Sequence, residues 1–133
     1  MRSLMLGALI WFGLQTSLYA QETDIQATIE KQLQAFQVDD FDAAFEFASP
    51  NLQRLFQNPK NFERMVTQGY PMVWRPGEVR YLELRQQDGA YWQRVMITDQ
   101  SGRVHVLDYR MLEIETGWRI NGVQILGSDD LSA

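Results

Sequence analysis

Residues 91–126 read YWQRVMITDQSGRVHVLDYRMLEIETGWRINGVQIL, and this stretch decides the fold. Apolar and polar side chains alternate along it, which is the period of a β-strand with one buried face. Together with the preceding VRYLELRQQ, the pattern predicts strands at residues 79–87, 91–98, 103–115 and 118–126. Hairpin turns are expected between them, at Asp88-Gly89, Asp99 to Gly102 and Thr116-Gly117. We therefore expect one antiparallel sheet in which sequential strands are neighbours.

The lengths of these turns assign a side of the sheet to every residue, because the loop of a hairpin sets its pairing. Loops of two, four and two residues predict an aliphatic buried face: Leu82, Leu84, Val95, Ile97, Val104, Val106, Leu112, Ile114, Val123 and Ile125. The opposite face then carries much aromatic area, and a partner surface is expected there at Trp92, Tyr109 and Met111. A bulge at Gly122 is the alternative, since it would move Trp118 and Ile120 to the core side.

Upstream of the sheet the apolar period becomes helical. An apolar stripe at spacings of three and four predicts a helix that begins at Thr23 or Asp24 and buries Ile25, Ile29, Leu33 and Phe36. Shorter helices are expected after Asp39-Asp40, Ser49-Pro50 and Asn58-Pro59, and Gly69 is expected to end the last one. The predicted fold class is α+β, with N-terminal helices packed on a four-stranded antiparallel sheet.

The first twenty residues have the composition of a secretory signal peptide. Arg2 supplies a positive start, residues 4–14 are almost wholly apolar, and a more polar stretch ends at Ala20. An apolar run of this length falls short of the roughly 20 residues that cross a bilayer. We expect cleavage between Ala20 and Gln21, a periplasmic or secreted protein without membrane insertion after signal removal, a single domain over 21–126 and a frayed tail over 127–133.

Composition excludes several classes of site and partner. The chain has no cysteine, which excludes disulfides, lipid attachment at cysteine, thiol nucleophiles and cysteine-ligated metals. Without Arg2 the chain keeps 11 of its 12 Lys and Arg residues against 17 Asp and Glu residues, a surface that repels phosphate backbones. Nucleic acid is therefore not an expected partner. With His105 as the only histidine and no calcium-loop spacing, neither a metal nor a cofactor is expected.

A family resemblance is carried by three stretches: QLQAFQVDDFDAAFEFASPNLQRLF (32–56), FERMVTQGYPMVWRP (62–76) and GWRINGVQIL (117–126). They resemble an uncharacterised family of short exported proteobacterial proteins, a domain of unknown function. That family is similar to the nuclear transport factor 2-like superfamily, whose members fold helices against a strongly curved sheet to form a cone. The resemblance implies this fold but no single activity, because the superfamily includes isomerases, dehydratases, hydrolases and non-catalytic binding modules.

Polar side chains interrupt the predicted aliphatic face at Gln93, Asp108, Arg110 and Asn121, with Tyr91 at its edge. Asp108 and Arg110 are two apart in one strand and point the same way, and Gln93 is expected across from Asp108. A buried carboxylate must be paired, hydrated or protonated. Asp108 therefore either forms a structural ion pair with Arg110 or faces a wet pocket as a general base. His105 is expected opposite Met96, on the other face from Asp108, which disfavours a catalytic His-Asp pair.

The segment between the last helix and the first strand carries Tyr70 and Trp74-Arg75. In a cone fold this segment crosses the mouth. Tyr70 and Trp74 therefore either hold a planar or anionic ligand there or plug the open end of the core.

These patterns favour an exported, non-catalytic module that binds a small apolar ligand or an envelope protein, as a homodimer through the exposed sheet face. The alternative is a cofactor-free lyase or isomerase that uses Asp108 as base, with Arg110 or Tyr91 stabilising the developing negative charge. The sequence leaves both functions open.

Overall fold

The computed structural model describes the backbone of residues 2–127 and the side chains of residues 18–127. Its helices are α1 (Arg2–Gln37), α2 (Phe41–Glu46), α3 (Pro50–Phe56), α4 (Pro59–Gly69) and α5 (Pro71–Trp74). Its strands are β1 (Pro76–Gln87), β2 (Ala90–Asp99), β3 (Val104–Ile114) and β4 (Gly117–Ile125), paired antiparallel in that order. The chain is therefore α+β, with helices that contact the sheet, as the sequence predicts. The predicted frayed tail falls outside the described residues from position 128 onward.

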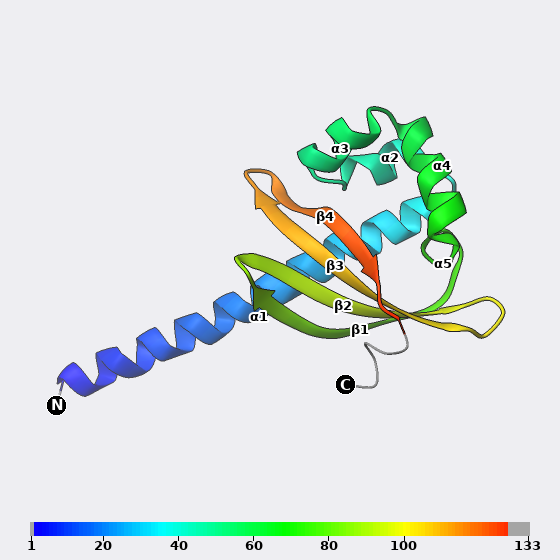
Figure 1. Cartoon of the computed structure of the whole chain (residues 1–133). Coiled ribbons are helices and arrows are strands. Elements are labelled where there is room, and N and C mark those ends of the chain that lie inside the picture. The colour runs from blue at the N-terminus through cyan, green and yellow to red at the C-terminus, as the bar shows by residue number, and fades with distance from the viewer. Residues whose placement is uncertain (1, 128–133) are drawn as a thin grey trace.

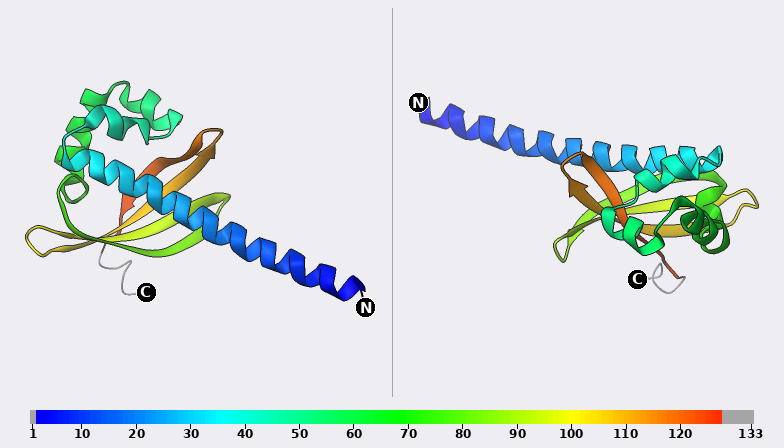
Figure 2. Two further views of the ribbon diagram at one scale, coloured as in Figure 1. Left: turned by 180° about the vertical axis from the view of Figure 1, so that it is seen from behind. Right: turned by 90° about the horizontal axis from the view of Figure 1, so that it is seen from above.

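Helix α1 lies across one face of a curved sheet, and its N-terminal half projects past the sheet (Figure 1, Figure 2). The predicted stripe of Ile25, Ile29, Leu33 and Phe36 is fully buried and forms the helical side of the core. The predicted start at Thr23 or Asp24 is wrong, because the helix is continuous from Arg2 and no proline interrupts it. None of the helices that the structure describes is both long and apolar enough to cross a membrane.

Helices α2, α3 and α4 begin where the sequence predicts, whereas the short helix α5 follows Gly69 at a place where no helix is predicted. The side chains of Asp40, Ser49 and Asn58 accept hydrogen bonds from backbone N–H groups in the first turns of α2, α3 and α4. Proline follows the cap in α3 and α4, and Gly69 is the last residue of α4. These helices gather around the C-terminal end of α1 and stand over one end of the sheet (Figure 1).

The register between β2 and β3 differs from the prediction. A four-residue loop would pair Thr98 with Arg103, whereas Thr98 pairs with Val104 and the Asp99 N–H donates to the Arg103 carbonyl at 2.8 Å. The turn thus comprises residues 100–102, and its last residue, Gly102, has φ +90°. Because side chains alternate with period two, this shift of one residue exchanges the two faces of β3.

Because the two faces of β3 are exchanged, the β3 residues that face the core differ from the predicted ones. The residues of β3 in the core are Leu107, Tyr109 and Met111, whereas Val104 is 59% exposed. Since Val106 and Leu112 alternate with the core residues, they belong to the outer face of the sheet. Tyr109 and Met111 are buried, so of the expected partner surface only Trp92 stays on the outer face.

Bulges in β1 and in β4 complete the inner face. The first lies between Tyr81 and Leu84 in β1, and it lets both side chains pack against the core. The second leaves Asn121 unpaired in β4, because Met111 pairs with Ile120 and the preceding Arg110 pairs with Gly122. Trp118 and Ile120 are buried on the core side, so the alternative of a bulge at this place is confirmed.

Candidate functional site

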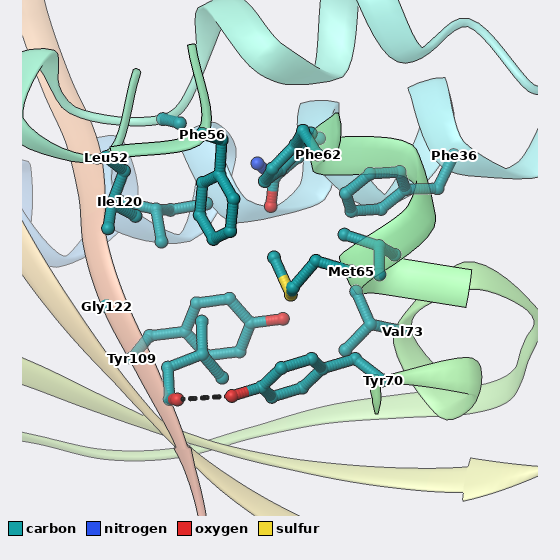
Figure 3. A pocket seen from close by; sticks show the side chains of 14 residues that line it. Phe36, Leu52, Phe56, Phe62, Met65, Tyr70, Val73, Tyr109, Ile120 and Gly122 are labelled. Atoms are coloured by element: carbon teal, nitrogen blue, oxygen red, sulfur yellow. Dashed lines mark hydrogen bonds between the residues drawn. The ribbon is translucent and has the colours of Figure 1, made fainter. Parts of the chain in front are cut away.

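A cavity of about 290 Å³ lies between the helices and the inner face of the sheet. Its helical wall comes from α1, α3, α4 and α5, and its other wall comes from β3 and β4. Most lining side chains are apolar, and they include the aromatic rings of Phe36, Phe56 and Phe62 (Figure 3). The cavity therefore offers a hydrophobic surface of the kind that holds small ligands.

The aromatic part of the wall is built around Phe62 of α4. Its ring centroid lies 5.8 Å from that of Phe36, 5.4 Å from that of Phe45 and 5.7 Å from that of Phe56, all at tilted or edge-on angles. Such contacts are worth about 0.5–1.5 kcal/mol each beyond the area they bury. Rings held by several neighbours give the cavity a defined shape rather than a collapsible one.

The helices are fastened to β4 at two points. At the first, the Ser49 N–H donates to the Ile120 carbonyl and the Ile120 N–H donates to the Phe47 carbonyl, both at 2.8 Å. At the second, the Tyr70 hydroxyl donates to the Val123 carbonyl at 3.1 Å. Ile120, Tyr70 and Val123 all line the cavity, so these bonds hold its two walls together.

The hydroxyl of Tyr109 points into this space from the floor of the sheet (Figure 3). Tyr109 is 0% exposed, and its oxygen has no hydrogen-bond partner among the residues that the structure describes. Burial, with a smaller contribution from nearby Tyr70, raises the pKa of the Tyr109 hydroxyl above its usual range, so the group stays protonated. A buried hydroxyl left unsatisfied costs about 1–3 kcal/mol, which marks this atom as a candidate ligand contact.

No charged side chain occurs among the described residues that line the cavity. Besides the tyrosines, its one polar side chain is Gln32, whose Nε2 donates to the Ala44 carbonyl at 3.1 Å. An ionised ligand group would therefore lose its hydration without gaining a counter-charge. The lining is suited to holding an uncharged molecule.

Asp108, the predicted pocket base, lies on the other face of the sheet. Its carboxylate accepts hydrogen bonds from Nη1 and Nη2 of Arg85, at 3.1 and 2.7 Å, and lies 3.9 Å from Nη2 of Arg94. The predicted pair with Arg110 is wrong, because Arg110 is exposed and stacks over the Trp92 ring at 5.8 Å. Hydrogen bonding to Asp108 raises the pKa of Arg85, as expected for a structural ion pair.

The two predicted amide residues have structural roles. Gln93, fully buried, donates to the carbonyls of Leu82 and Arg94 at 3.0 Å each, next to the bulge in β1. It pairs with Tyr109 and not with Asp108. Asn121 accepts a 2.6 Å hydrogen bond from the Ser49 hydroxyl and so strengthens the first fastening point.

Tyr70 and Trp74 have different roles. Tyr70 lines the cavity, whereas the indole nitrogen of Trp74 donates to Asp39 at 2.9 Å. Arg75 binds the same carboxylate through one nitrogen, at 2.9 and 3.1 Å, and stacks on the Trp74 ring at 4.3 Å. The hydrogen bonds from Trp74 and Arg75 lower the pKa of Asp39. These contacts fasten the turn after α1 and add nothing to the cavity.

The remaining candidates also lie outside the cavity. The Tyr91 hydroxyl donates to Gln21 in α1 at 3.3 Å, and its ring packs edge-on against Trp118. His105 pairs with Ile97 instead of Met96, and its Nε2 lies 2.8 Å from Asp99, the last residue of β2. Among the side chains that the structure describes, no three His, Asp or Glu residues gather into a group that could hold a metal ion.

The fold and the cavity together define a small α+β domain with an apolar, uncharged pocket between its helices and its sheet. A family model described as a domain of unknown function (DUF4864) matches residues 19–133, and the chain belongs to this family. No curated protein and no solved structure matches it. The resemblance to the nuclear transport factor 2-like superfamily is not confirmed by solved structures and stays a prediction.

Tyr109 is the cavity residue that the sequence prediction places on the wrong face of the sheet. The prediction of a partner surface fails because it assigns four residues to the β2–β3 turn, whereas this turn has three. The sequence does carry a signal for the shorter turn: Gly102 follows Asp99 and Ser101, and three-residue hairpin loops commonly end in a glycine with positive φ.

We predict different stability effects for two Tyr→Phe substitutions. Tyr109→Phe removes an unpartnered hydroxyl and is expected to leave the free energy of unfolding unchanged or to raise it by about 1 kcal/mol. Tyr70→Phe breaks the bond to the Val123 carbonyl and is expected to lower it by about 0.5–1.5 kcal/mol. Each variant is first refolded from denaturant, and its free energy of unfolding is then measured by titration with urea. A loss in Tyr109→Phe equal to that in Tyr70→Phe contradicts the assignment.

Proposed function

We propose that this protein is an exported, non-catalytic module that holds a small apolar ligand between its helices and its sheet. The observation that carries the proposal is the apolar cavity with no charged side chain in its described lining. Natural ligand pockets begin at about 300 Å³, and an engineered apolar cavity of about 150 Å³ already binds benzene. A cavity of about 290 Å³ is thus large enough for a single-ring molecule with a short substituent.

The partial exposure of several lining residues supports an opening through which a ligand can enter the cavity. Phe36, Phe62 and Ile120 are buried, whereas Leu52, Met65 and other lining residues are half-buried. The half-buried residues form an outer rim through which a ligand could enter. Methionine at this rim is favourable, because its flexible thioether adapts to different apolar shapes.

The competing functions have less support. The lyase alternative requires a carboxylate in the pocket, and Asp108 lies on the outer face of the sheet in an ion pair with Arg85. The homodimer that the sequence predicts for this module requires an aromatic surface, but Tyr109 and Met111, two of the three residues expected there, belong to the core. Trp92 alone, covered in part by Arg110, is a small contact area for a partner.

Export is supported by where the core begins. Leu18 and Tyr19 are 62% and 72% exposed, and Ile25 is the first buried residue among those whose side chains the structure describes. Cleavage between Ala20 and Gln21 would therefore remove no described core residue. The family match, which begins at Tyr19, also covers little of the segment ahead of this bond.

We predict that cumene (isopropylbenzene) binds in the cavity. With about 25 cal/mol gained per Å² of apolar area and the cost of association subtracted, a Kd on the order of 0.1–1 mM is expected. Titration of the full-length chain should shift the NMR methyl signals of Val66, Val73 and Ile120, which line the cavity. Saturating cumene without any shift of these signals contradicts the proposal.

Two substitutions in α3 provide a matched control for this titration. Leu52 lines the cavity, whereas Leu55 is 69% exposed and does not. Leu52→Trp is expected to weaken cumene binding at least about tenfold by filling the space, and Leu55→Trp to change it less than about twofold. Equal effects of the two substitutions would mean that cumene binds elsewhere.

For export, we predict that Gram-negative cells expressing the full-length chain accumulate a periplasmic protein that begins at Gln21. Ala20→Arg should block this processing, because the cleaving peptidase requires a small residue before the cut. Gln21→Ala is the control and should be processed normally. Intact-mass measurement of the fractionated protein distinguishes these results, and an unprocessed wild-type chain in the cytoplasm refutes the export claim.

A further inference from the structure

We infer that the ligand is an uncharged carbonyl compound, a ketone, aldehyde or ester, whose oxygen accepts a hydrogen bond from the Tyr109 hydroxyl. This inference rests on the proposed ligand-binding function and specifies the chemistry of the ligand. It follows from three properties of the cavity: one donor without a partner, an apolar surround and the absence of charge in the described lining.

The donor is the Tyr109 hydroxyl. It is fully buried, aimed into the cavity and unpartnered among the described residues (Figure 3). The nearby Tyr70 hydroxyl already donates its proton to the Val123 carbonyl at 3.1 Å. Of the two tyrosine hydroxyls that line the cavity, only that of Tyr109 therefore has a proton to offer a ligand. An acceptor atom placed there would satisfy a group that is otherwise buried at a cost.

The charge of the ligand is limited by the lining. A carboxylate or phosphate group would be desolvated with neither Lys nor Arg to compensate it among the described lining residues. An ammonium group would likewise find no carboxylate there. The acceptor that Tyr109 meets must therefore be neutral, and a carbonyl oxygen is a neutral acceptor with two lone pairs that an otherwise apolar small molecule can carry.

The shape of the surround limits the rest of the molecule. The Tyr109 hydroxyl lies among the side chains of Met65, Phe56 and Tyr70 in the cavity (Figure 3). These side chains offer apolar area, and the aromatic ones offer ring faces and edges. A carbonyl attached to an aryl or short alkyl body fits both features, with the body against the rings and the oxygen at Tyr109.

The test compares three ligands of equal size: cumene, acetophenone and benzoate, which are apolar, carbonyl-bearing and anionic. Each is titrated by NMR into the full-length wild-type chain and into Tyr109→Phe, with Tyr70→Phe as a matched control that loses an engaged hydroxyl instead. In Tyr109→Phe, acetophenone should bind about 3- to 10-fold more weakly, and cumene should change by less than about twofold. In Tyr70→Phe the ratio of the two affinities should stay constant. Benzoate should not compete with either.

The outcomes separate this inference from the proposed function. If cumene does not bind the wild-type chain, the ligand-binding function itself is overturned. If cumene and acetophenone both bind but Tyr109→Phe changes them equally, or if benzoate binds as tightly as acetophenone, only the carbonyl inference is overturned. Unchanged cumene binding by Tyr109→Phe also shows that this variant has kept its fold. As a second readout, the carbonyl stretch of bound acetophenone should lie at lower frequency in the wild-type chain than in Tyr109→Phe.

Discussion

The hydrogen bonds of Asp99 in the β2–β3 turn are the constraint on which the arrangement of the sheet depends. The Asp99 carboxylate accepts bonds from the Ser101 N–H at 2.9 Å, the Ser101 hydroxyl at 2.6 Å and the Arg103 N–H at 3.0 Å, and His105 lies 2.8 Å from its second oxygen. The Ser101 hydroxyl and then His105 lower the pKa of Asp99, so the carboxylate keeps its charge. Because its folded-state pKa is lowered, Asp99 stabilises the fold above its ordinary pKa and ceases to do so under strong acid. This turn places Tyr109 inside and Asp108 outside.

Two consequences follow from that placement. The side chain of Asp108 in β3 is 7% exposed and lies on the outer face. It forms ion pairs with Arg85 of β1 and Arg94 of β2, and these contacts link the three strands. Tyr109 lies under the helices, in a cavity kept open by rigid rings and by the two points at which the helices are fastened to β4. The ion pairs of Asp108 on the outer face therefore stabilise the sheet, and the inner face carries the proposed ligand site. In the proposed function, the shape of the cavity and the Tyr109 hydroxyl would select the ligand.

Features set by local sequence were predictable. Helix caps at Asp40, Ser49 and Asn58, the α1 stripe and the approximate strand bounds all depend on residues close in sequence. The face of the sheet to which each β3 side chain belongs was not predictable. Loops of three and four residues differ only in whether Asp99 pairs with Arg103, and that difference moves every side chain of the strand to the opposite face. The cavity was also beyond prediction, because no motif encodes how far α3 and α4 stand from β4. The partners of Asp108 come from other strands, which spacing within β3 could not identify.

The most direct test of this account is the pairing of β2 with β3, measured by cross-strand nuclear Overhauser effects between backbone protons in the isotope-labelled chain. The structure predicts contacts between Gln93 and Tyr109 and between Thr98 and Val104. Contacts of Gln93 with Asp108 and of Thr98 with Arg103 would contradict it. In that case the Asp108 side chain would face the helices, the Tyr109 hydroxyl would lie on the outer face, and the proposed ligand site would not exist.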